Sequence, residues 1–300
     1  MHQFIAILLY FCLALTVGIL SYRKQTTSSA FLSGDRSLNY WLTALAAHAS
    51  DMSNWLFMGY PAIIFLGGIF QAWVALGLIF CMLLNWQWLA PKIRIATEKF
   101  NCFTLSSYLE NRFQDKVGLI RTFSALLSFV FYSIYIAAGL AGLGLLGESL
   151  FGISFETSIL IGIGIVVTYI FIGGYVTLAW LDLFQGFFLL FVILAVPFYL
   201  IPQFGGFSSL FQNLQTKELS TSLFPNLSPR TLLTIISLSL GWGLGYFGQP
   251  HIITKFMGIK HAAEIYKSKW VGMSWMTLSL FAATLVGILG VTFFPSGIHN

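Results

Sequence analysis

The chain has 300 residues, of which 57% are hydrophobic, 17% are aromatic and only 8% are charged. Soluble domains carry about 25% charged residues, so this chain has too few polar side chains to cover a surface in water. A soluble enzyme is therefore excluded. Continuous apolar stretches of about 20 residues recur along the sequence, as membrane-spanning helices require. The composition predicts an all-α polytopic membrane protein.

Eight long apolar stretches predict eight membrane-spanning helices. The first is not preceded by basic residues but is followed by Arg23 and Lys24. We therefore expect a retained helix with its N-terminus outside, and not a signal peptide. In chain order the predicted helices are Gln3–Ser21, Leu38–Phe70, Gln71–Ala90, Val117–Phe151, Phe155–Gly174, Leu178–Ile201, Pro229–Met257 and Lys269–Phe294.

The basic residues support this topology. Thirteen of the fifteen Lys and Arg residues fall on one side of the eight-helix arrangement, and only Lys217 and Arg230 fall outside it. Because short cytoplasmic loops retain Lys and Arg, that side is predicted to be cytoplasmic. The net charge of +5 is thus a topology signal, and no nucleic-acid partner is expected.

Two connections and the cysteines complete the predicted organisation. Between Pro91 and Lys116 a short cytoplasmic helix is expected, since hydroxyl residues there precede an amphipathic stretch. The segment 202–228 contains Gly, Ser, Asn and Pro and is predicted to be an outer loop. The three cysteines have neither disulfide nor metal-ligand spacing, so no redox role is expected.

The second predicted helix is interrupted by polar residues in the sequence LTALAAHASDMSNWLFMGYP. Asp51 stands there beside Ser50, Ser53 and Asn54, where an unpaired carboxylate would cost about 2.5 to 3.5 kcal/mol in a membrane. A cation held by hydroxyls and by carbonyls of an unwound segment would satisfy the charge. Alternatively, an Arg or a hydrogen-bond cluster from a neighbouring helix would satisfy the charge of Asp51.

The seventh predicted helix contains a second interruption, LSLGWGLGYFGQPHI. Its glycines lower the cost of unwinding and Pro250 lacks a backbone N–H, so we expect backbone carbonyls to face a cavity. Close helix packing through a glycine face is the alternative. Trp242 and Tyr246 are four residues apart, a spacing that favours an aromatic wall around a small organic solute.

The two interrupted helices cross the predicted membrane in opposite directions. Discontinuous helices at corresponding positions of two inverted halves are typical of secondary transporters, whose site lies near the bilayer midplane. The sequence therefore predicts an inverted-repeat transporter.

Several stretches closely resemble the sodium/solute symporter family, with the sodium/proline symporters as the nearest branch. They are ASDMSNW from Ala49 to Trp55, FIGG at 171–174, GWGLGYFGQPHI at 241–252 and SGDRSL around Arg36. The resemblance implies a LeuT-type inverted-repeat fold within a single transmembrane domain. Residues 3–21 would form an extra N-terminal helix, 38–201 the first five-helix repeat, and 229–294 the first two helices of the second repeat.

The resemblance also implies roles for individual residues. Ala49 and Met52 would offer backbone carbonyls to sodium, Asp51 would support the ion electrostatically, and Ser50 and Ser53 would place hydroxyls near ion and solute. The solute cavity and the ion path would contain a further set: Trp55, Tyr135, Trp242, Tyr246 and Pro250 around the solute, Asp182 on the inward ion path and Arg36 near the cytoplasmic gate.

Each of these roles has an alternative. Tyr135 would otherwise fill the bundle core, and Asp182 and Arg36 would otherwise be solvated or ion-paired charges near the cytoplasmic interface. His48 and Asn54 depart from the family pattern, which usually has glycine at both positions. They would fill part of the site or alter which solute fits, and His48 would also admit proton coupling unless it is buried and neutral.

The expected function is sodium-coupled symport of a small solute, L-proline first, across the cytoplasmic membrane by alternating access. Sodium is the coupling ion, and neither an organic cofactor nor a catalytic residue is expected because HExxH, GxSxG and paired catalytic carboxylates are missing. A non-transporting sensor or scaffold is one alternative. Since only two helices of the second repeat are present, an inactive fragment of a split symporter is another, with the remaining helices on a second polypeptide.

Overall fold

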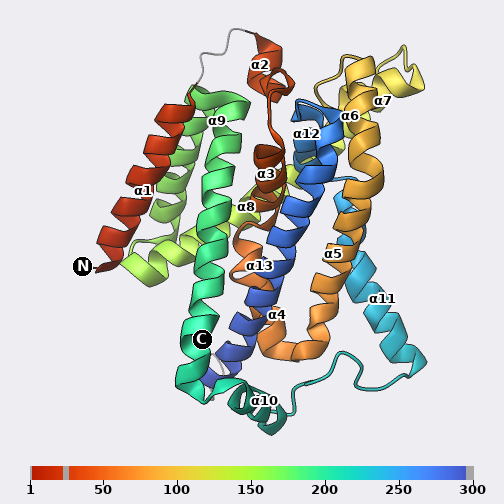
Figure 1. Ribbon diagram of the computed structural model, residues 1–300. Helices are drawn as coiled ribbons and strands as arrows, with labels where there is room; N and C mark the ends of the chain where they lie inside the picture. The colour runs from red at the N-terminus through yellow and green to blue at the C-terminus, as the bar shows by residue number, and fades with distance from the viewer. Residues whose placement is uncertain (1, 23–26, 295–300) are drawn as a thin grey trace. The chain divides into compact units, whose positions relative to one another are not determined.

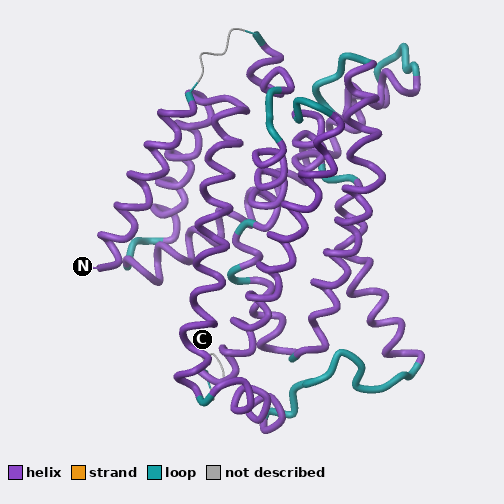
Figure 2. Tube along the Cα trace, in the orientation of Figure 1, coloured by secondary structure: helices purple, strands orange, loops and turns teal. Residues whose placement is uncertain are grey.

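The computed structural model describes residues 2–22 and 27–294. Throughout these residues the chain is helical, with loops between the helices and no strand beyond two isolated β-bridges, as Figure 2 shows. The all-α prediction is therefore confirmed. Arg23 and Lys24, on which the expected orientation of the first helix partly rests, lie outside the described residues.

The helices follow the predicted apolar stretches closely (Figure 1). The N-terminal half contains α1 His2–Ser21, α2 Ser28–Ser33, η1 Gly34–Arg36, α3 Tyr40–Met52, η2 Asn54–Leu56, α4 Gly59–Gly67, η3 Ile69–Ala72, α5 Trp73–Leu84, the π-helical turn η4 Asn85–Leu89, α6 Ala90–Lys99 and α7 Leu105–Phe113. The rest contains α8 Leu119–Phe151, α9 Phe155–Leu200, η5 Ile201–Phe204, α10 Gly206–Thr216, α11 Pro229–Gly243, η6 Leu244–Phe247, α12 Pro250–Gly258, η7 Ala262–Glu264 and α13 Ile265–Phe293.

Several of these helices are long and apolar enough to cross a membrane. Among the described residues there are four by length and composition, or five if the interrupted pair 229–247 and 250–258 is one span. Three shorter apolar helices occur at 9–21, 54–67 and 155–168. Helices occupy all eight predicted ranges, but the count of eight spans stays a prediction.

The chain divides into two compact units that interleave along the sequence. Unit 1 comprises 1–50, 90–185 and 250–268, and unit 2 comprises 51–89, 186–249 and 269–300. Both predicted helix interruptions lie at boundaries between these units, after Ser50 and after Gln249.

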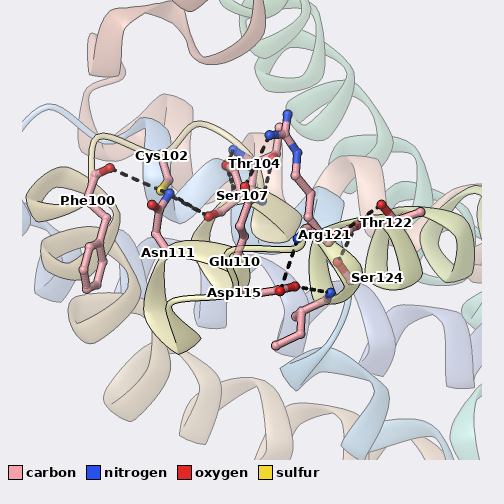
Figure 3. Close-up of polar contacts among 12 residues, drawn as sticks. Phe100, Cys102, Thr104, Ser107, Glu110, Asn111, Asp115, Arg121, Thr122 and Ser124 are labelled. Atoms are coloured by element: carbon pink, nitrogen blue, oxygen red, sulfur yellow. Dashed lines mark hydrogen bonds and ion pairs between the residues drawn. The ribbon is translucent and has the colours of Figure 1, made fainter.

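Within unit 1, the connection between α6 and α8 is held by local hydrogen bonds (Figure 3). Thr104 and Ser107 form a capping box at the start of α7, and the Asp115 carboxylate accepts three backbone N–H groups at the start of α8. Glu110 pairs with Arg121 across the junction at 3.3 Å. The predicted short helix between 91 and 116 is thus present as α7.

Within unit 2, the segment 202–228 is more ordered than its composition predicts. It contains the eleven-residue helix α10, which buries Leu210 and Leu214. These leucines are four residues apart and so share one face of the helix. The polar composition concealed an amphipathic helix, and only the remainder of the segment, up to Ser228, is the predicted loop.

In unit 2, α5 and α11 pack closely against each other and run side by side in Figure 1. A Cβ atom on Gly77 would collide with the backbone of Ser239, and one on Gly243 would collide with Cys81 and the Gly77 carbonyl. Gly77 and Cys81, and likewise Ser239 and Gly243, are four residues apart. Such pairs of small residues allow close approach of membrane helices.

We expect the substitution Gly77→Ala to destabilise unit 2 by about 1 to 3 kcal/mol, because backbone cannot yield as a flexible side chain does. The matched control is Gly241→Ala on α11, where an added Cβ meets nothing within 4 Å. That control should be neutral or stabilising by up to about 1 kcal/mol. Thermal unfolding of both variants in detergent compares them, and equal stabilities would contradict the packing argument.

Candidate functional site

The first interruption is a break in the helical backbone immediately after Met52. Ser53 has φ 39° and ψ −150°, a conformation that non-glycine residues rarely adopt. The α-helix α3 therefore ends at Met52, and the chain continues as the short 3-10 helix η2. Carbonyl groups in the last turn of a helix lack donors within the helix. Ala49 and Met52, the predicted sodium ligands, belong to this last turn.

The side chains around this break are largely withdrawn from solvent. In unit 1, the Ser50 hydroxyl donates to the Ala46 carbonyl at 2.5 Å, and His48 is fully buried. In unit 2, Met52 is buried and Asp51 and Ser53 are half-buried, while Ser53 donates to the Asn54 side chain at 3.4 Å. The two residues that depart from the family pattern thus both fill space next to the break.

The second interruption replaces α-helix by a 3-10 turn and a loop. In unit 2, α11 ends at Gly243 and η6 runs to Phe247, and in unit 1 α12 begins at Pro250. The Tyr246 carbonyl accepts a hydrogen bond from the Asn85 side chain at 2.8 Å. A carbonyl released by the break is therefore held by a buried amide, a contact that the sequence did not reveal.

The glycines of this segment serve two purposes. Gly243 is the close-packing glycine described above, whereas a Cβ on Gly241 would meet nothing and one on Gly245 or Gly248 would make only ordinary contacts. The packing alternative therefore holds at Gly243. The other three positions leave room, as unwinding requires.

The predicted solute residues of unit 2 are partly brought together. Trp55 lies against Trp242 with ring centroids 5.2 Å apart, and against Tyr60 at the same distance. The Trp55 indole nitrogen is buried without a hydrogen-bond partner among the described residues. Trp242 is half exposed, at 50%, whereas Tyr246, which lies within the 3-10 turn η6, is buried.

The predicted solute residues of unit 1 lie near the end of α3. The Tyr135 hydroxyl, from α8, donates to the Ser50 carbonyl at 3.3 Å. Its ring is stacked on His251, the residue that follows Pro250, with centroids 5.8 Å apart and an interplanar angle of 22°. Tyr135 is 40% exposed, so it is not a core-filling residue within this unit.

Asp182 forms an ion pair within unit 1. Its Oδ2 atom lies 2.8 Å from Nζ of Lys255, and the two side chains are only 17% and 9% exposed. Lys255 also lies 5.0 Å from the centroid of the Tyr175 ring, whose hydroxyl donates to the Thr254 carbonyl. Tyr175 follows Gly174, where φ 62° interrupts α9. The ion-paired alternative for Asp182 is therefore realised in this structure.

Arg36 binds backbone carbonyls at the end of α6 and in the loop that follows it. Its Nη2 donates to Thr97 at 2.9 Å and to Cys102 at 3.3 Å, and the guanidinium lies over the Phe103 ring. Burial, followed by the charge of Arg94, lowers the pKa of Arg36. Arg36 thus ties η1 to the loop after α6, in contacts separate from those of Asp182.

Comparison with known proteins decides the family. The model of the Sodium:solute symporter family matches residues 31–296. The chain belongs to this family. As a symporter-family chain it is a multi-pass membrane protein, in agreement with its long apolar helices.

Relatives of this symporter-family chain include two bacterial transporters. A "Sodium/proline symporter" of Salmonella typhimurium is 38% identical over 93% of this chain and 55% of the relative. A "High-affinity proline transporter" of Bacillus subtilis is 37% identical over 93% of this chain and 59% of the relative. The chain therefore spans little more than half the length of the curated relatives it matches.

A solved structure shows the fold. The structure of a Na+-coupled sialic acid symporter in a substrate-bound, outward-open state aligns with 99% of this chain and 62% of its own, with a TM-score of 0.81 and 16% identity. At that identity the likeness concerns the fold alone. It confirms the predicted transporter fold, of which this chain provides a part.

Several residues with central contacts in this symporter-family chain were not predicted. Lys255 and Arg94 were counted only as topology signals, although both are buried. Asn85, Tyr132 and His251 were not singled out at all. An amide, a tyrosine or a histidine inside an apolar stretch signals a need for partners, but the sequence does not say which partner each one finds.

Proposed function

We propose that the protein transports a small solute, L-proline first, together with sodium across the cytoplasmic membrane by alternating access. The observation that carries the proposal is the interrupted helix α3, whose backbone leaves the helical region at Ser53 within the stretch that resembles the symporter motif. Discontinuous helices of this kind bind coupling ions in secondary transporters. The names of the relatives support proline as the solute.

The proposed roles follow the chemistry of the donors. Sodium takes oxygen ligands, and we assign the carbonyls of Ala49 and Met52 to it, with Asp51 supplying negative charge and Ser50 and Ser53 supplying hydroxyls. Trp55, Trp242, Tyr135, Tyr246 and Pro250 are assigned to the solute, with Asp182 on the inward ion path and Arg36 at the cytoplasmic gate. The Trp55 N–H, buried without a described partner, is suited to donate to a solute carboxylate.

The energetics of coupling to one sodium ion are sufficient. Moving one charge through 100 mV contributes about 2.3 kcal/mol, which supports a solute gradient of about fiftyfold. We also propose that the N-terminus lies outside, in accordance with the distribution of Lys and Arg. Transport by this mechanism requires no catalytic residue and no organic cofactor.

The test is uptake of labelled L-proline by proteoliposomes under an imposed sodium gradient. We expect uptake with sodium outside and none with potassium, and Asp51→Asn should raise the sodium concentration for half-maximal uptake at least about tenfold, or about 1.4 kcal/mol. Because the chain spans little more than half of its relatives, uptake is measured for the chain alone and with a co-expressed C-terminal part of a relative. Folded protein that shows no sodium-dependent uptake in either setting refutes the proposal.

A further inference from the structure

A compact aromatic cluster in unit 1 joins α8 to the start of α12. The Tyr132 hydroxyl accepts the backbone N–H of His251 at 2.7 Å and lies 2.7 Å from Nδ1 of the same histidine. A hydroxyl that accepts the N–H and donates its own hydrogen to Nδ1 satisfies all three groups, with the ring proton on Nε2. Tyr132 therefore contacts His251 at two points, the backbone N–H and Nδ1 of the ring.

The oriented histidine in turn holds Tyr135. The two rings are stacked with centroids 5.8 Å apart and 22° between their planes, and Tyr132 meets Tyr135 edge-on at 6.3 Å. Tyr132 and Tyr135 are three residues apart on α8, so both rings project from the same side of the helix. The Tyr135 ring, although 40% exposed, thus has both His251 and Tyr132 as neighbours.

The held tyrosine reaches the interrupted helix. Its hydroxyl donates to the Ser50 carbonyl at 3.3 Å, in the last turn of α3, next to the carbonyl of Ala49. A hydrogen bond to this carbonyl restrains the peptide planes of the turn, because neighbouring planes share one Cα atom. The path from α12 to α3 therefore runs from His251 through Tyr135 to Ser50.

We propose that His251 and Tyr132 are positioning residues for the sodium site: they hold Tyr135 on the Ser50 carbonyl and so set the shape of the ion-binding turn. The proposal rests on the proposed sodium-coupled transport and names the residues that support its ion site. Neither residue is assigned to the ion or to the solute. Groups that orient metal ligands commonly change metal affinity by 10-fold to 100-fold when they are removed.

The test uses four substitutions and two measurements. Tyr132→Phe removes the hydroxyl, Tyr135→Phe removes the donor to Ser50, His251→Leu removes the ring, and His251→Asn retains a polar atom near the position of Nδ1. Hydrogen exchange of the amides in 50–56 measures the order of the turn, and sodium-dependent uptake measures the function. Tyr199→Phe, at a residue 71% exposed, is the matched control.

We expect Tyr132→Phe, Tyr135→Phe and His251→Leu to speed exchange at the turn and to raise the sodium concentration for half-maximal uptake about tenfold. The maximal rate at saturating sodium should change little in Tyr132→Phe and His251→Leu, and His251→Asn should retain part of the wild-type sodium affinity. The double variant Tyr132→Phe/Tyr135→Phe should be no worse than either single variant, because both act through one hydrogen bond.

The outcomes separate this proposal from the transport proposal. If wild-type protein takes up proline and the variants keep its exchange rates and sodium dependence, or lose only maximal rate, the positioning role is overturned. Additive effects in the double variant overturn it as well. If wild-type protein shows no sodium-dependent uptake, the transport proposal fails, and faster exchange in the variants still supports the placement of Tyr135 by His251 and Tyr132.

Discussion

Asp182→Asn is expected to destabilise the folded chain by about 3 to 5 kcal/mol, the cost of removing one partner from a buried ion pair. Nζ of Lys255 lies 2.8 Å from the carboxylate, and both side chains are largely withdrawn from solvent. The substituted amide supplies no charge, so the Lys255 ammonium loses its counter-ion and is left beside the Tyr175 ring. Thermal unfolding in detergent and in lipid nanodiscs measures the loss.

The control removes both charges. Asp182→Asn/Lys255→Gln leaves no uncompensated charge, and we expect it to recover most of the stability that Asp182→Asn loses, since replacing a whole buried pair is often neutral. The stability of Lys255→Gln alone should lie between the stabilities of Asp182→Asn and the double variant. It should be below that of the double variant because a carboxylate is then left without its cation. A double variant as unstable as Asp182→Asn would show that the pairing is not the source of the loss.

The same pair bears on the proposed ion path. A sodium ion that reaches Asp182 has to displace or share Lys255, so the lysine competes with the ion for one carboxylate. Lys255→Gln should therefore increase the apparent affinity for sodium on the cytoplasmic side, in addition to lowering stability. Efflux from proteoliposomes at varied internal sodium tests this, and an unchanged affinity would remove Asp182 from the ion path.

Local features of the fold were predictable from the sequence because they depend on near neighbours. The polar run around Asp51 located the break at Ser53, and the hydroxyl residues near Thr104 located α7 through a capping box that spans four residues. The helix α10 was missed because Gly and Ser dominate its start and conceal the spacing of Leu210 and Leu214. Patterns among residues close in sequence thus predicted where the helices lie. The polar composition of a segment was the main reason for a missed helix.

The contacts of the candidate site were less predictable, because they join residues far apart in the sequence. Lys255 is separated from Asp182 by 73 residues and Asn85 from the Tyr246 carbonyl by 161. No periodicity links such pairs. The count of cytoplasmic basic residues included Lys255 and Arg94, although burial and pairing now explain their positions without reference to topology.

Arg94→Met is the other substitution with a large expected effect, about 3 kcal/mol or more. Arg94 is 3% exposed, and its guanidinium donates to the carbonyls of Ile259 at 2.7 Å and Lys260 at 3.0 Å and to Glu98 at 2.7 Å. Hydrogen bonds to charged groups contribute about 1.5 to 3 kcal/mol each. Methionine fills much of the volume but leaves both carbonyls without this donor.

The position of these two carbonyls explains why the effect of Arg94→Met should extend beyond the immediate neighbours of Arg94. They follow the end of α12 at Gly258, where Leu38 pairs with the same segment through Leu38 N–H to Gly258 O and Lys260 N–H to Leu38 O. Arg94 therefore fixes the end of α12 and, through it, the segment that precedes α3. Loosening this junction should also speed hydrogen exchange in 37–40, to which Arg94 makes no hydrogen bond among the described residues.

Two further arginine variants separate geometry from charge. Arg94→Lys keeps the charge but lacks the planar fork that reaches two carbonyls at once, so its stability should fall between wild type and Arg94→Met. Arg112→Met, at an exposed residue of α7, should be close to wild type. If Arg94→Lys matches wild type, charge alone suffices at this position and the two-carbonyl geometry contributes nothing to the anchoring of α12.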